Sequence, residues 1–150
     1  MSAYYGTLTQ ANDYFASQLD AAYWEQNNTI RKERALRQAK RIIDRLPYFG
    51  EPVGEDAFPR GDQIEVPAQV REAQYEIAYA LLSGLDPEAV INAGVHRIES
   101  IAGATVTKSG TLPHFANGVP SATAWDLLQP YMDNRNILRA TYLNEDYVDA

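Results

Sequence analysis

Residues 30–46 read IRKERALRQAKRIIDRL and carry the clearest structural pattern in the chain. Apolar side chains recur there at steps of three and four, which is the spacing of one face of an α-helix. They are Ala35, Leu36, Ala39, Ile42, Ile43 and Leu46. Pro47 ends the pattern because a proline inside a helix removes a backbone hydrogen bond and clashes with the preceding turn. We therefore predict an amphipathic helix over about 30–46 that turns one face to a helical core.

The same stretch concentrates positive charge. Seven of the 13 basic residues fall between positions 31 and 45, and four of the arginines share one helical stripe. The stripe consists of Arg34, Arg37, Arg41 and Arg45. Three interpretations stay open at this point. The stripe is a solvated face whose long stems cover the edge of the core, a contact with another subunit or partner, or a phosphate-binding surface.

Further helices are predicted on both sides of this one. Thr7 is a good N-cap, and Gln10 three residues on completes a capping box. Leu8, Ala11, Tyr14, Phe15 and Leu19 follow at helical spacing and predict an inward stripe. The other expected helices begin at Pro67 and end at Gly84, span about 87–93, and run from Ser121 to Met132 with a weak point at Pro130.

Between the helices, β-branched residues on either side of Gly103 predict a β-hairpin or extended arm near 95–108. The fold class is therefore mainly α, a small bundle of four to five helices with this arm and an extended C-terminal tail. We expect one domain over 1–132, including the arm, and a partner-docking tail over 133–150. The tail is expected to dock because it keeps large apolar groups: Ile137, Leu138, Tyr142, Leu143, Tyr147 and Val148.

Composition excludes several classes of function. The chain has 150 residues, no cysteine and a formal net charge of −7. Without thiols there is no thiolate metal site and no thiol nucleophile, and the acidic balance disfavours charge-driven wrapping of nucleic acid. The longest apolar runs are only a few residues, so no membrane-spanning segment and no membrane partner are expected.

Enzyme signatures are missing as well. His96 and His114 are far apart and have no neighbouring carboxylate at ligand spacing, and no nucleophile-elbow, P-loop or dinucleotide-binding motif occurs. We therefore expect no catalytic, metal-binding or cofactor-binding residues, no cofactor, and a protein that is not an enzyme.

Aromatic residues crowd the first 24 positions. Tyr14 and Phe15 lie on the predicted apolar stripe and are expected in the core. The others are less constrained, and beside a basic groove such rings serve single-strand binders as stacking platforms. They are Tyr4, Tyr5, Tyr23 and Trp24.

The order of motifs over about residues 4–132 resembles a known family. The motifs include Tyr5-Gly6-Thr7-Leu8-Thr9, Ala35-Leu36-Arg37-Gln38-Ala39, Phe58-Pro59-Arg60-Gly61, Val70-Arg71-Glu72-Ala73-Gln74 and Leu127-Leu128-Gln129-Pro130-Tyr131. In this order they resemble the small tailed-phage proteins often labelled DnaT-like single-stranded-DNA-binding proteins. The layout is also similar to that of head-completion adaptors, which sit between portal and tail.

The resemblance implies a virion structural protein, a head–tail adaptor that forms a ring of twelve copies below the portal. Its partners are then the portal protein, a tail-side neck protein (stopper or tail terminator), other copies of itself, and genome DNA that passes the channel without specific binding. Its location is the virion neck, and the host cytoplasm during assembly. The alternative is a single-stranded-DNA-binding replication accessory, which rests on the basic run and the N-terminal aromatics.

Two sets of site residues follow from the adaptor interpretation. The apolar tail residues Leu138, Tyr142, Leu143 and Tyr147 are expected to bind the portal. The arginines Arg37, Arg41 and Arg45 are expected at the subunit interface.

Overall fold

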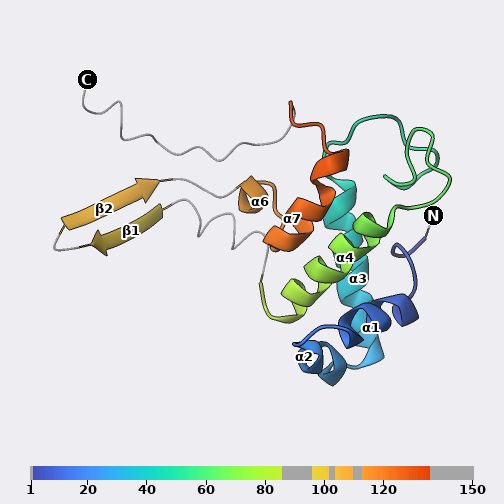
Figure 1. Ribbon diagram of the computed structural model, residues 1–150, viewed down its shortest axis with the longest axis horizontal. Helices are drawn as coiled ribbons and strands as arrows, with labels where there is room; N and C mark the ends of the chain where they lie inside the picture. Colours follow the sequence, from blue (N-terminus) through green and yellow to red (C-terminus); the bar gives the residue numbers. More distant parts are fainter. Residues whose placement is uncertain (1, 86–95, 102–103, 110–112, 136–150) are drawn as a thin grey trace.

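The computed structural model describes residues 2–85, 96–101, 104–109 and 113–135 (Figure 1). Its helices are α1 Leu8–Ala16, α2 Ala21–Gln26, α3 Thr29–Asp44, α4 Ala68–Leu82, α6 Pro113–Ala116 and α7 Ala122–Leu128, followed by the 3-10 helix η1 Gln129–Tyr131. Its strands are β1 His96–Ile101 and β2 Ala104–Ser109. The mainly helical class is confirmed. The helix expected over about 87–93 lies outside the described residues.

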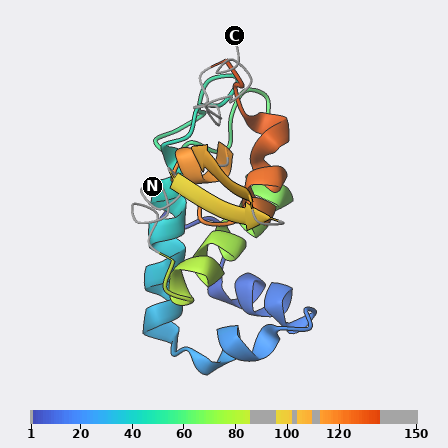
Figure 2. The same ribbon diagram turned by 90° about the vertical axis from the view of Figure 1, so that its left-hand side faces the viewer.

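Helices α3 and α4 form the centre of the molecule. They pack along each other, and α7 packs on α4 (Figures 1 and 2). Helix α3 buries the apolar side that its periodicity predicts, and α4 buries the side that includes Val70, Ala73 and Ile77. Helices α1 and α2 lie near one end of α3, and the loop that follows α3 lies at the other (Figure 1).

Several predicted helix ends are confirmed by their hydrogen bonds. The Gln10 N–H donates to Thr7 Oγ1 over 3.1 Å, and the Thr7 N–H donates back to Gln10 Oε1 over 3.0 Å. The Ala124 N–H donates to Ser121 Oγ over 3.1 Å, and η1 replaces the α-helix at Pro130, the predicted weak point. Gly6, just before the first cap, has a φ of 74°, and a Cβ there would lie 2.7 Å from Tyr75 Oη.

The predicted inward position of Leu19 is wrong. Helix α1 ends at Ala16, and a separate short helix, α2, follows after a turn. Leu19 falls in that turn and is 105% exposed, so the helical stripe that placed it in the core does not reach it. The sequence pattern also missed α2, whose six residues are too few to show a helical period.

The two strands pair antiparallel, with His96 opposite Ser109 and Ile101 opposite Ala104. In Figure 1 the hairpin stands apart from the helices. Only its backbone pairing is described, so its role as an arm of the fold stays a prediction. Among the described residues, no helix is long and apolar enough to cross a bilayer.

Candidate interaction surfaces

One side of α3 presents a row of guanidinium groups to solvent. Arg31, Arg34, Arg37, Arg41 and Arg45 are all exposed and lie opposite the buried side of the helix. We call these five residues the arginine face. At 1.5 Å per residue the face extends for roughly 21 Å. The structure thus brings together the three predicted subunit-interface residues and adds two more arginines to them.

The arginine face has little to pair with in its own chain. The Arg31 Nε donates to the Asn27 side-chain oxygen over 3.1 Å. The other four have no carboxylate within ion-pair distance in the part of the chain that the structure describes. Four exposed cations on one helix side are therefore available to a partner.

The two lysines of the basic run leave this face and take part in the core. Lys32 Nζ lies 5.4 Å from the centre of the Trp24 ring and 3.3 Å from Asn12 Oδ1. Lys40 is 6% exposed, with Nζ 2.7 Å from Asp44 Oδ2 and 2.8 Å from Asp56 Oδ1. The seven basic residues therefore divide into five outward arginines and two inward lysines.

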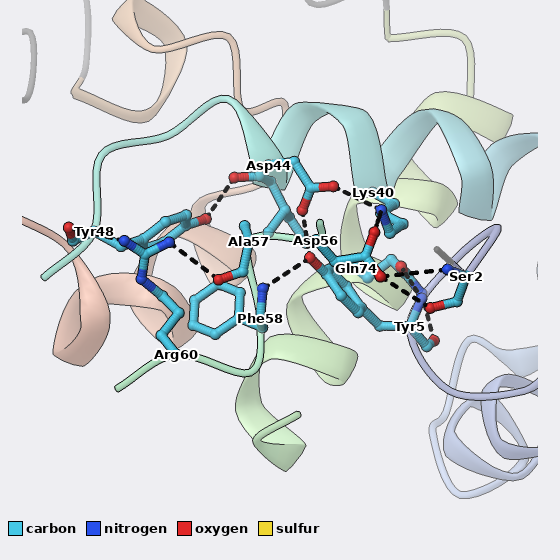
Figure 3. A network of polar contacts seen from close by, with 11 residues as sticks. Ser2, Tyr5, Lys40, Asp44, Tyr48, Asp56, Ala57, Phe58, Arg60 and Gln74 are labelled. Atoms are coloured by element: carbon cyan, nitrogen blue, oxygen red, sulfur yellow. Dashed lines mark hydrogen bonds and ion pairs between the residues drawn. The ribbon is translucent and has the colours of Figure 1, made fainter. Parts of the chain in front are cut away.

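Lys40 joins three segments of the chain, as Figure 3 shows. Its partner Asp44 is on α3, and its partner Asp56 belongs to the following loop. Asp56 also accepts from the backbone N–H of Ser2 over 3.3 Å and from its hydroxyl over 3.2 Å. The loop and the N-terminal segment are thus fixed on α3 through one ammonium group.

These contacts predict a pH-dependent stability. Burial raises the pKa of Asp56, but hydrogen bonds from Lys40 and Ser2 outweigh it and hold the pKa below its usual range. Burial lowers the pKa of Lys40, but hydrogen bonds to Asp44 and Asp56 outweigh it and raise the pKa. Asp56 therefore stabilises the fold above its unfolded pKa, and this contribution is lost as the pH falls through the lower folded value. The contribution of Lys40 is lost only as the pH rises through its raised folded pKa.

Lys40→Met is expected to lower the free energy of unfolding by about 3 kcal/mol at pH 7, because it leaves two carboxylates without their cation. The deficit should shrink as the pH falls, because without Lys40 the burial of Asp56 raises the pKa of that carboxyl and favours its neutral form. Urea unfolding at pH 3 and pH 7 measures both values. Arg41→Met, on the exposed side of the same helix, is the control and should change neither. An equal deficit at the two pH values would contradict this account of the lysine.

Tyr5 is part of the core. It is 1% exposed, and its hydroxyl donates to Asp44 and accepts from the backbone N–H of Phe58. Its backbone N–H donates to Gln74 Oε1 over 2.8 Å, and Gln74 Nε2 donates to the Tyr5 carbonyl over 2.9 Å. The ring is therefore closed to a nucleotide base.

Trp24 is also in the core. It is 0% exposed, stacks on Phe15 with 4.4 Å between ring centres, and donates from Nε1 to Asn12 Oδ1 over 2.9 Å. Tyr23 keeps 36% of its surface, and its hydroxyl donates to the Leu82 carbonyl. Tyr5 and Trp24, which the sequence left less constrained than Tyr14 and Phe15, are therefore core residues and do not form a stacking platform.

The loop from Tyr48 to Val66 is held by Arg60. The Arg60 guanidinium donates to the carbonyl oxygens of Phe49 over 3.0 Å, Gly50 over 2.6 Å and Ala57 over 3.0 Å. It also lies 5.3 Å from the centre of the Tyr48 ring (Figure 3). These contacts give the Phe58-Pro59-Arg60-Gly61 motif a structural reason, because its arginine closes the loop on itself.

The outer side of this loop is acidic and apolar. We call residues 49–65 the acidic loop, because it contains five carboxylates and a single basic residue, Arg60. Glu51, Asp62 and Glu65 are exposed. Phe49, Val53 and Ile64 are exposed by 54%, 62% and 97%. This surface was not predicted from the sequence, although the run of acids around one arginine could have indicated it.

The structure adds little on metal-binding side chains, on the histidines or on the proposed portal-binding residues. The described residues contain no cluster of three or more side chains that could hold a metal ion. His114 is buried, and burial lowers its pKa. The proposed portal-binding residues Leu138, Tyr142, Leu143 and Tyr147 lie outside the described residues.

The family model described as "Putative DnaT-like ssDNA binding protein" matches residues 4–140. The chain belongs to this DnaT-like family. The match includes every described helix and strand, and with them the arginine face and the acidic loop of this DnaT-like protein. No curated protein and no solved structure matches the chain.

Proposed function

We propose that this DnaT-like protein is a virion structural protein, a head–tail adaptor that forms a ring below the portal and surrounds the DNA channel in the phage neck. One observation carries the proposal. The arginine face is exposed and largely unpaired, while Tyr5 and Trp24, two of the four aromatic rings that could have served as stacking platforms beside it, are buried. Cations with half of these rings withdrawn into the core, in a chain of net charge −7, suit an acidic protein surface better than a nucleotide strand.

In the proposed ring, Arg37, Arg41 and Arg45 lie at the contact between neighbouring subunits. A contact that joins two different surfaces of identical chains closes into a ring when the rotation between them allows it. Twelve copies form the ring. Positive charge is then kept in the subunit contacts, and the remaining acidic surface lets DNA pass without being held.

The proposed partners of the ring lie at its two ends. The apolar tail residues Leu138, Tyr142, Leu143 and Tyr147 bind the portal, and a stopper or tail terminator binds on the tail side. The protein works in the virion neck, after assembly in the host cytoplasm. It carries out no catalysis and needs no cofactor.

Electron microscopy of particles from a deletion mutant tests this proposal. Lysates without the protein should contain separate heads and tails. Supplying the wild-type chain from a plasmid should restore joined particles. Normal numbers of joined virions in the mutant would overturn the adaptor function.

The arginine face also favours a second candidate, a single-stranded-DNA-binding replication accessory. Five arginines along one helix can follow a phosphate backbone, and the family description names single-stranded DNA. If all five contacted phosphates, affinity should fall about 100-fold between 50 and 200 mM salt, from a slope of about −0.7 per contact.

A titration with fluorescent single-stranded DNA separates the two functions. The adaptor proposal expects no binding at about 50 mM salt, because Tyr5 and Trp24 are in the core and the net charge of the chain is negative. Tight binding that fades at 200 mM salt and is lost in Arg37→Glu/Arg41→Glu would favour the replication function instead.

A further inference from the structure

We infer that the arginine face of one copy docks on the acidic loop of a second copy of this chain. The inference rests on the proposed ring and names its contact surfaces. Exposed charge on both sides supports it. The arginine face has four arginines without a carboxylate partner among the described residues, and the acidic loop exposes Glu51, Asp62 and Glu65. Facing charges of opposite sign fix the register of a contact and speed its formation.

The ion pair and hydrogen bonds that hold the acidic loop involve other side chains than these three exposed carboxylates. Asp56 is bound to Lys40, and Arg60 is bound to backbone carbonyl oxygens. The loop's own positive charge is therefore turned inward. What remains on its outer side is negative, which makes it the match for a surface of guanidinium groups.

Apolar side chains lie within both surfaces. Ile30 is 61% exposed, and its spacing of four and seven residues from Arg34 and Arg37 puts it on the arginine side of α3. On the loop, Phe49, Val53 and Ile64 are exposed among the carboxylates. Interfaces between proteins combine such an apolar centre with a polar rim. Burial of these side chains against each other would add to the charge attraction.

The acidic loop is ordered before any partner binds. The Val53 N–H donates to the Pro59 carbonyl over 3.0 Å, and the Gly61 N–H donates to the Glu51 carbonyl over 2.8 Å. With the Arg60 contacts and the Lys40–Asp56 ion pair, these bonds fix the loop from both sides. A surface that is already ordered loses less conformational entropy on association.

The two surfaces are different patches of one chain, so the contact is head-to-tail. Each copy can give its arginine face to one neighbour and its acidic loop to another. Loss of either surface should leave a copy that still forms one contact but cannot extend an assembly. This consequence separates a head-to-tail contact from a two-fold contact of one patch with itself.

Sedimentation velocity of the full-length chain at about 500 µM in 50 mM salt tests the inference with three variants. Arg37→Glu/Arg41→Glu reverses the arginine face, Asp62→Lys/Glu65→Lys reverses the acidic loop, and the third variant carries all four changes. Each two-residue variant should weaken self-association by roughly 100-fold. A mixture of the two should associate far more strongly than either variant alone, because each reversed surface meets a surface of opposite charge on the other variant. For the same reason the four-residue variant should associate as wild type does.

Asp13→Lys/Glu25→Lys is the matched control, because it reverses two exposed acids outside the loop and should associate as wild type does. A wild-type chain that stays monomeric overturns the inference. So does a four-residue variant that stays monomeric while wild type associates. Wild-type behaviour of both two-residue variants overturns it too, yet leaves the adaptor function intact, since that function is judged by the particles of the deletion mutant.

Discussion

Trp24→Ala is expected to lower the free energy of unfolding by about 3–5 kcal/mol, the usual cost of removing a large aromatic side chain from a core. Trp24 has no exposed surface, and its ring stacks on Phe15 and lies under the ammonium group of Lys32. Removal of the ring also leaves the Asn12 side-chain oxygen without the indole N–H. The melting temperature should fall by about 10 °C.

The controls for this prediction are Trp24→Phe and Leu19→Ala. Trp24→Phe keeps an aromatic ring on Phe15 and should cost less than Trp24→Ala. Leu19→Ala removes a large apolar side chain that is fully exposed and should leave the stability unchanged. Differential scanning calorimetry measures all three. A Trp24→Ala variant that keeps its melting temperature but loses affinity for single-stranded DNA would show that the ring binds bases.

Removal of residues 136–150 is expected to weaken portal binding by at least about 100-fold while the fold remains stable. The deleted segment carries Leu138, Tyr142, Leu143 and Tyr147. Burial of one such side chain contributes about 1.5–3 kcal/mol, so the loss of even two of them exceeds a 100-fold change in affinity.

The cut falls at the end of the described residues, and two contacts near it lie on the retained side. The Asp133 N–H donates to the Pro47 carbonyl over 3.0 Å, and Arg135 is bound to the Asp133 carboxylate over 2.9 Å. Both contacts remain in the shortened chain. Its melting temperature should match wild type, and binding to immobilised portal rings should be lost. Removal of 149–150 alone is the control. Unchanged portal affinity of the shortened chain would assign portal binding to another surface.

Local signals in the sequence predicted the helical frame. Helix α3 follows from its apolar period, and Asn28 caps it through a 2.9 Å bond from the Arg31 N–H. The capping box at Thr7 and the cap at Ser121 are where the sequence places them. Each of these features depends on residues a few positions apart, which is the range over which pattern and capping rules apply.

The contacts that define the surfaces depend on distant residues. Tyr5 is hydrogen-bonded to Gln74, which lies 69 positions away in the sequence. Lys40 is hydrogen-bonded to Asp56 in the loop that follows α3. Arg60 donates hydrogen bonds to backbone carbonyl oxygens. Every residue has such an oxygen, so the sequence does not show which ones Arg60 binds. The sequence therefore predicted a basic helix and left four N-terminal aromatic rings less constrained. The structure divides the basic side chains between core and surface and buries two of the rings.

This division is the basis of the proposed function. The description of the DnaT-like family names single-stranded DNA binding. In this chain, however, Tyr5 and Trp24 have partners in the core, and the arginine face has few partners. An exposed face of cations and an ordered acidic loop in one chain suit the repeated contact between copies that we propose. The proposed adaptor function would use both surfaces, whereas the replication function would use only the arginines.

Co-sedimentation with purified portal rings in the presence of a large excess of single-stranded oligonucleotide tests the central claim most directly. The chain should sediment with the rings in about 150 mM salt, and the oligonucleotide should not displace it. A chain that stays in the supernatant with the oligonucleotide, and leaves the portal rings bare, would contradict the account.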